Sequence, residues 1–265
     1  GGERKVCTVF FSDVAGFTTI SEQMTPEALV KLLNQYLTEM TNIIFEYDGM
    51  LDKYEGDAIM AVFGAPIAHG NHAYKCCAAA LEMQEKLVLL RNLWSKQGKP
   101  QLHVRCGINT GPMIVGNMGS EARFDYTVMG DAVNLGARLE PANKEYGTLI
   151  MIGENTYKMA KDQIIVRQLD LLRVIGRKEP AKVYELVGLS EKGISEQKNQ
   201  VIQFFDKGME NYLLQNWDMA VKYYKQALSI DPMDGPSKRY IARCEQFLET
   251  PSGEGWDGVF TMKTK

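Results

Sequence analysis

The chain has 265 residues, 45% of them hydrophobic, and a formal net charge of -3. This is long and apolar enough for one full domain with a small annex, and the interspersed charges give no basic surface for a nucleic-acid polymer or an anionic membrane. The five cysteines are odd in number and lack C-x-x-C spacing, which argues against a disulfide framework or zinc site and favours the cytoplasm. No apolar run approaches the ~20 residues of a membrane span, so any membrane anchor is expected upstream of residue 1.

The first half of the chain predicts a mixed α/β (α+β) fold. Apolar runs alternate with segments of helical periodicity, and Thr25 followed by Pro26 is a typical helix start. The expected elements are a strand at 6–12, a helix at 26–49, strands at 50–54 and 58–63, a helix at 71–96 and a strand at 102–109. The order β-α-β-β-α-β is that of the split βαβ, ferredoxin-like unit, and further strands and helices are expected up to Leu189.

The C-terminal quarter of the chain has a different sequence pattern. A polar stretch at 190–199 predicts a linker, and residues 200–249 then resemble a single tetratricopeptide repeat followed by a capping helix at 236–248. The residues at the repeat offsets are Phe204, Gly208, Ala220, Tyr224, Ala227 and Pro232. The expected organisation is therefore an α/β domain over 1–189, the linker, the helical segment and a tail over 250–265. One repeat cannot bury its own faces, so it is expected to dock on the α/β domain, a second copy or a partner protein.

Two aspartates 44 positions apart are the first candidates for chemistry. In a split βαβ unit, the turn between strands two and three lies at the edge where strand one ends, which brings Asp57 towards Asp13. Paired carboxylates without histidine or thiolate suit Mg²⁺ or Mn²⁺ carrying a polyphosphate. On spacing alone, ordinary turn residues explain both positions equally well. The loop of Gly16, Phe17 and Thr18 between them favours phosphate binding, since it leads into a helix whose first N–H groups are free.

A second candidate is the helix that begins at Gly130 and Asp131. Asn134 and Arg138 share one of its faces, while leucines at 135 and 139 share another. The leucine face indicates core. Taken alone, a polar pair at this spacing is usually only the solvated side of a helix.

Four blocks of the sequence resemble, in order and spacing, the signature blocks of class III nucleotidyl cyclases, and the similarity covers roughly residues 4–189. The blocks are VFFSDVAGFT, LDKYEGDAIMAVFG, VRCGINTGPMIVGNMG and DYTVMGDAVNLGARLE. The resemblance implies an adenylate cyclase that converts ATP to cyclic AMP and pyrophosphate with two Mg²⁺ or Mn²⁺ ions per site.

The resemblance also implies roles for individual residues. They are metal binding by Asp13, Asp57 and the Val14 carbonyl, adenine reading by Lys53 and Thr127, ribose orientation by Asn134, transition-state stabilisation by Arg138 and triphosphate binding by Arg177. The last position departs from the family pattern, which usually has a lysine at Ile175 as well. Thr127 replaces the aspartate of many adenylate cyclases and resembles a subgroup that includes bicarbonate-stimulated enzymes.

The preference for adenine also follows from the hydrogen-bond donors and acceptors of the base and the protein. A Lys53 ammonium donating to N1 and a Thr127 hydroxyl accepting from N6 suit adenine and mismatch guanine. Guanylate cyclase is the nearest alternative enzyme, and a catalytically silent scaffold working through the helical repeat is the alternative from another class. The family further implies a homodimer whose two sites each take the metal aspartates from one chain and the other catalytic residues from its mate.

Overall fold

The computed structural model describes residues 1–173 and 178–261. Its strands are β1 Glu3–Val14, β2 Met50–Glu55, β3 Ala58–Phe63, β4 Val104–Gly119, β5 Phe124–Met129, β6 Ile150–Gly153, β7 Ile164–Arg173, β8 Ala181–Leu189 and β9 Phe260–Thr261. Its helices are α1 Phe17–Glu22, α2 Pro26–Glu46, α3 His72–Lys96, α4 Asp131–Tyr146, α5 Glu154–Ala160, α6 Glu196–Leu213, α7 Trp217–Ile230 and α8 Gly235–Glu249. Across these residues, no helix is long and apolar enough to cross a membrane.

The strands form one mixed sheet in the order β2-β3-β1-β4-β6-β8-β7-β9, with β5 paired to β4 outside this path. β3 lies between β2 and β1 and is antiparallel to both, so β1 and β2 run in the same direction. This confirms the expected ferredoxin-like unit. The apolar run in β1 follows from its central position, because β1 is paired on both edges by β3 and β4.

Helices cover both faces of the sheet around β1. Phe10 and Val14 point to the face packed by α2 and α3, whereas Val9 points to the opposite face, against α4. The backbone of α4 approaches β4 closely at Gly107, where an added Cβ would lie 2.4 Å from the Glu140 nitrogen. The sheet that carries β1 and the helix α4 are thereby packed closely against each other.

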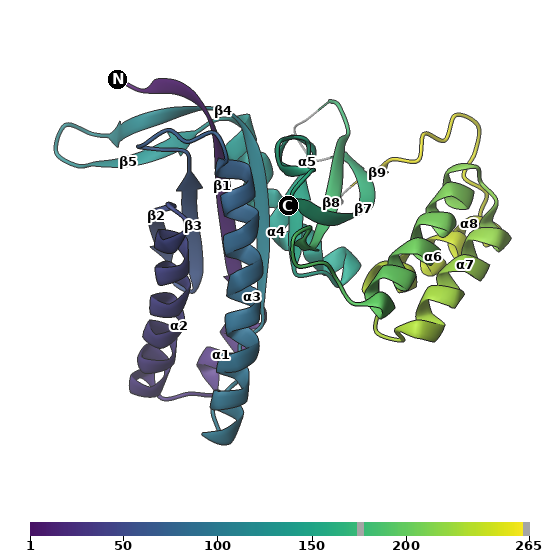
Figure 1. Cartoon of the computed structure of the whole chain (residues 1–265), viewed down its shortest axis with the longest axis horizontal. Coiled ribbons are helices and arrows are strands. Elements are labelled where there is room, and N and C mark those ends of the chain that lie inside the picture. Colours follow the sequence, from purple (N-terminus) through teal and green to yellow (C-terminus); the bar gives the residue numbers. More distant parts are fainter. Residues whose placement is uncertain (174–177, 262–265) are drawn as a thin grey trace.

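Two elements differ from the sequence-based expectation. β4 continues to Gly119 because its second half pairs with β5 as a two-stranded arm, which reaches past the ends of β2 and β3 in Figure 1. α6 begins at Glu196, inside the stretch predicted as linker, because the Ser195 hydroxyl caps it by accepting a hydrogen bond from the Lys198 backbone. The start of α2 is as expected, with Thr25 as its cap.

The helices α6, α7 and α8 form a small bundle at the end of the molecule away from α2 (Figure 1). α6 and α7 meet at Gly208, where an added Cβ would lie 2.4 Å from the Tyr224 ring. The bundle contacts the sheet through buried polar groups. The Tyr240 hydroxyl donates to the Leu169 carbonyl, and Arg243 donates to Asp170, which also accepts from the Tyr146 hydroxyl at the end of α4.

Candidate active site

Asp13 and Asp57 lie together at the end of β1. The Val14 backbone N–H donates to Asp13 Oδ1 and to Asp57 Oδ2, each at 3.0 Å. Asp13 stands in the last residues of β1, and Asp57 occupies the turn between β2 and β3. The parallel direction of β1 and β2 is what places this turn beside the end of β1.

Two carboxylates this close repel each other when both are ionised. Burial, the hydrogen-bonding contact with Asp57 and the charge of Asp57 raise the pKa of Asp13 to about 7. A divalent cation would offset this repulsion, so the pair fits a hard metal ion with oxygen ligands. Within residues 1–173 and 178–261 no group of three or more His, Cys, Asp or Glu side chains could hold a metal, so other oxygen donors would have to complete the coordination.

The loop after Asp13 turns sharply into α1. Gly16 adopts a left-handed conformation with φ of 66°, which a residue without Cβ adopts at no steric cost. Phe17 is half-buried and packs against the core between β1, α2 and α3, whereas Thr18 is exposed. The Phe17 side chain therefore anchors the loop, while Gly16 and Thr18 on either side of it are exposed.

Lys53 and Thr127 come from different strands, and both lie next to Asp52. The sequence analysis did not predict a role for Asp52. The Thr127 hydroxyl donates to Asp52 Oδ2 at 2.5 Å, and Lys53 Nζ lies 3.6 Å from Asp52 Oδ1. Thr127 reaches this position because β5 belongs to the arm that extends from β4. The predicted base-reading pair is thus one cluster in space, with Asp52 between its members.

Asn134 and Arg138 are exposed on α4, while Leu135 and Leu139 are buried. This matches the two faces predicted from their spacing. A cavity of about 110 Å³ contains Asp13 and Lys53 and is bounded on the α4 side by residues other than this polar pair, namely Ala137 and Glu140. Asn134 and Arg138 are therefore not among the residues that line the cavity at Asp13.

Arg105 is a further charged residue beside the carboxylates. It lies directly opposite Asp13 in the register of β1 and β4, and its Nε is 3.5 Å from Glu140 Oε2. Sequence reasoning missed it, although its place at the start of the block VRCGINTG was visible. The antiparallel pairing of β1 with β4 would have indicated that Arg105 lies beside Asp13. Arg177, predicted to bind triphosphate, lies outside the described residues.

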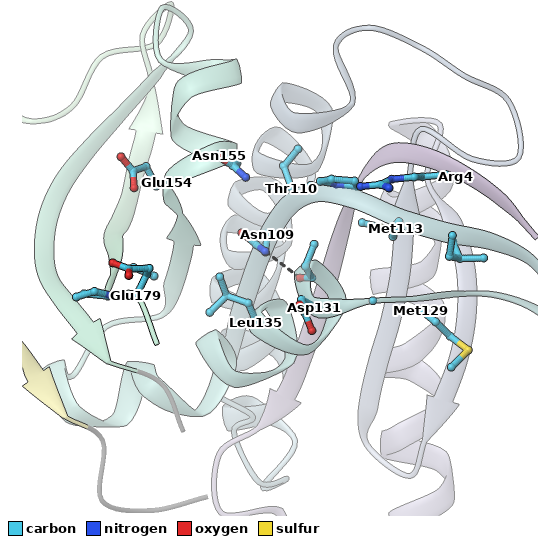
Figure 2. A pocket seen from close by; sticks show the side chains of 17 residues that line it. Arg4, Asn109, Thr110, Met113, Met129, Asp131, Leu135, Glu154, Asn155 and Glu179 are labelled. Carbon is cyan, nitrogen blue, oxygen red and sulfur yellow. Dashed lines mark hydrogen bonds between the residues drawn. The ribbon is translucent and has the colours of Figure 1, made fainter. Parts of the chain in front are cut away.

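A larger cavity of about 490 Å³ lies beside the start of α4 (Figure 2). Asn109, Asp131 and Leu135 are among its lining residues, and the Asn109 amide donates to the Ala132 carbonyl at 2.8 Å. This bond fixes the first turn of α4 on β4. None of the predicted site residues that the structure describes lines this cavity, so it is separate from the carboxylate pair.

Comparison with known proteins places the chain in a family. Residues 2–188 match the model of the adenylate and guanylate cyclase catalytic domain. Adenylate cyclase 1 of Rhizobium meliloti is 36% identical over 186 residues, which are 70% of this chain and 28% of that protein. The terminal-differentiation specific adenylate cyclase of Dictyostelium discoideum is 32% identical over 250 residues, 93% of this chain and 12% of that protein.

A solved structure gives the same result. The adenylyl cyclase CyaB from P. aeruginosa superposes with a TM-score of 0.65 at 40% identity, covering 71% of this chain and 96% of that one. The chain spans less than a third of the length of the two curated relatives above. The matched residues 2–188 contain β1 to β7, all of β8 except its last residue, and every predicted site residue. The chain therefore belongs to the adenylate and guanylate cyclase catalytic domain family.

Proposed function

We propose that this chain is an adenylate cyclase that forms cyclic AMP and pyrophosphate from ATP. The observation that carries the proposal is the convergence of Asp13 and Asp57 on one backbone N–H, which supports a divalent-cation site at the end of β1. The names of the relatives from R. meliloti, D. discoideum and P. aeruginosa support adenylate rather than guanylate chemistry.

In this proposal, Asp13, Asp57 and the Val14 carbonyl would hold two Mg²⁺ or Mn²⁺ ions. When bound, such ions would lower the pKa of the attacking ribose 3'-hydroxyl and neutralise charge on the departing pyrophosphate. The backbone of Gly16, Phe17 and Thr18 contacts phosphate oxygens. Arg105, next to Asp13, adds a cation on the same side, and Arg177 is proposed to bind the triphosphate.

Base selection rests on the cluster around Asp52. Lys53 donates to adenine N1, and Thr127 accepts from the N6 amino group. Guanine reverses both requirements, because its N1 is a donor and its O6 an acceptor. A site built for one pattern of donors and acceptors can reject the other strongly.

The remaining two residues act on sugar and phosphorus. Asn134 orients the ribose, and the Arg138 guanidinium stabilises charge on the oxygens of the phosphorus under attack. Both are exposed on α4, and the cavity of about 110 Å³ at Asp13 is well below the ~300 Å³ or more of typical ligand pockets. A homodimer would resolve this, because the α4 of a second copy can complete the site of the first.

Exposed apolar side chains support such an assembly. Phe124 and Met129 on β5 are 60% and 56% exposed, and Ile114 on β4 is 41% exposed. Apolar side chains gathered on one arm are typical of an interaction surface. The helical segment, proposed to be a tetratricopeptide-like repeat, leaves this arm uncovered because it packs at the far end of the sheet (Figure 1).

A product assay tests the proposal. Purified protein is given ATP or GTP with Mg²⁺ or Mn²⁺, and cyclic AMP and cyclic GMP are measured. Cyclic AMP is the expected main product, and Asp57→Ala should abolish it while leaving the thermal unfolding transition in place. Asp162→Ala, at an exposed position in a turn, is the matched control and should keep full activity. Full activity in Asp57→Ala would remove the two-metal mechanism, and cyclic GMP as the main product would replace the proposed substrate.

A further inference from the structure

Asp52 occupies an irregular position in its strand. The register of β2 and β3 shifts between Leu51 and Lys53, so Asp52 is left outside the regular pairing. Such a bulge re-aims a side chain relative to the regular alternation of a strand. The Asp52 side chain is 0% exposed, although Lys53 next to it is 40% exposed. Burying a carboxylate is unfavourable unless other groups compensate its charge, and two groups in the structure do so.

The first partner is the Thr127 hydroxyl, which donates to Asp52 Oδ2. A carboxylate only accepts hydrogen bonds, so the single proton of this hydroxyl is committed to Asp52. The Thr127 oxygen can then offer only its lone pairs to any other group. Without Asp52, the hydroxyl could rotate and act as a donor instead.

The second partner is the Lys53 ammonium, 3.6 Å from Asp52 Oδ1. Oδ1 is buried and has no hydrogen-bond partner among the residues that the structure describes, so the charge of Lys53 is its principal compensation. This attraction holds the ammonium on the same side as Thr127. One buried carboxylate therefore orients a donor and an acceptor next to each other.

We propose that Asp52 is a specificity-determining positioning residue, which makes Thr127 an obligatory acceptor and Lys53 a fixed donor towards the nucleobase. This arrangement matches the N6 donor and N1 acceptor of adenine and opposes the O6 acceptor and N1 donor of guanine. The inference rests on the proposed function, because it assigns Lys53 and Thr127 to the base. It adds that the identity of Thr127 alone does not decide base choice, since a hydroxyl can donate or accept.

The test replaces Asp52 by the near-isosteric asparagine. The amide nitrogen that Asp52→Asn introduces can donate to Thr127, which frees the hydroxyl proton to point at the base. The ratio of kcat/KM for ATP to that for GTP should fall about tenfold to a hundredfold. Asp125→Asn removes the same charge from an exposed position on β5 and should leave the ratio unchanged. If Asp52→Asn fails to fold, Asp52→Ser offers a smaller group that can also donate to Thr127.

A double variant separates positioning from simple structural damage. Thr127→Val removes the hydroxyl, so adding Asp52→Asn to it should change the ATP-to-GTP ratio much less than Asp52→Asn does in the unaltered chain. An equal change in both backgrounds would overturn the role through Thr127. An Asp52→Asn variant with a lower melting temperature and an unchanged ratio would show a merely structural role. If the unaltered chain makes no cyclic AMP, the proposed function is wrong. If the unaltered chain makes cyclic AMP but Asp52→Asn leaves the ATP-to-GTP ratio unchanged, only this inference is wrong.

Discussion

Arg167 and Asp234, 67 positions apart, form a two-pronged ion pair in which Nη1 and Nη2 of the arginine each donate at 2.9 Å to one carboxylate oxygen. Both side chains are buried, and Asp234 also caps α8 by accepting from the Ser237 backbone. Burial alone would raise the pKa of Asp234, but the hydrogen bonds and charge of Arg167 hold that pKa below its usual value. The pair fastens the first turn of α8 to β7 of the cyclase sheet.

Removal of one member of this pair should destabilise the protein strongly. Arg167→Met leaves Asp234 buried without its cation, which is expected to cost about 3–5 kcal/mol of unfolding free energy. Denaturant unfolding followed by circular dichroism would measure the loss. Arg173→Met is the matched control, because the side chains of its pair with Asp257 are 43% and 53% exposed, and an exposed ion pair contributes little to stability. Equal losses in the two variants would contradict a special role for the buried pair.

Backbone contact between α8 and α4 predicts a second effect. An added Cβ at Gly235 would lie 2.1 Å from the carbonyl oxygen of Tyr146, the last residue of α4. Gly235→Ala should therefore push the two helices apart, lower stability by about 1–3 kcal/mol and reduce cyclase activity, because α4 carries Asn134 and Arg138.

The control for this change is Gly70→Ala. A Cβ at Gly70 meets no atom of the described residues within 4 Å, so this variant should keep both its melting temperature and its activity. Melting curves and cyclic AMP assays on the two variants compare the effects directly. An active, fully stable Gly235→Ala protein would show that the helical bundle is not coupled to α4 through this contact.

The raised pKa of Asp13 predicts how metal binding changes with pH. In the metal-free protein, the raised pKa of about 7 lets native Asp13 keep its proton up to about pH 7, while in the unfolded chain it is released near the ordinary aspartate pKa of 3.8. The native state thus binds more protons over this window, and the contribution of Asp13 to stability falls as the pH rises through it. A divalent cation favours the ionised form. The rise in melting temperature caused by Mg²⁺ should therefore be larger at about pH 8 than at about pH 5.5.

Asp57→Asn provides the control for this prediction. It removes one carboxylate of the pair and with it part of the repulsion that raises the pKa of Asp13. We expect little Mg²⁺ stabilisation in this variant at either pH. A Mg²⁺ effect of equal size at both pH values in the unaltered protein would argue against metal binding at Asp13.

Mixing two inactive variants tests whether the site is shared. In a two-fold homodimer with composite sites, Asp57→Ala and Arg138→Ala each damage both sites, but a mixed dimer collects both lesions in one site. Random exchange makes about half the dimers mixed, each with one working site, so roughly a quarter of the unaltered activity should return. Cyclic AMP is measured before and after mixing, with exchange verified by differently tagged chains. Verified mixed dimers without activity would place all catalytic groups in one chain.

Much of the fold and of the candidate site was predictable because it depends on local pattern. Apolar periodicity and the cap at Thr25 predict elements within a few residues, since they involve neighbours within one or two helical turns. The placement of Arg138 and Leu139 on different faces of α4 follows from helical geometry alone. The meeting of Asp13 with Asp57 needed one more step, the parallel direction of strands one and two in a ferredoxin-like order.

Tertiary structure decided the remaining features, because they depend on which distant backbones approach each other. The place of Asp52 arises from a shift in strand register, and its bond to Thr127 joins residues 75 positions apart. The pairing of Arg167 with Asp234 requires α8 to pack on β7, and neither residue carries a local signal of its partner. Composition and spacing determine which side chains share a face of one element. Only the packing of elements determines which faces meet, because that is a sum over many weak contacts between residues far apart in the chain.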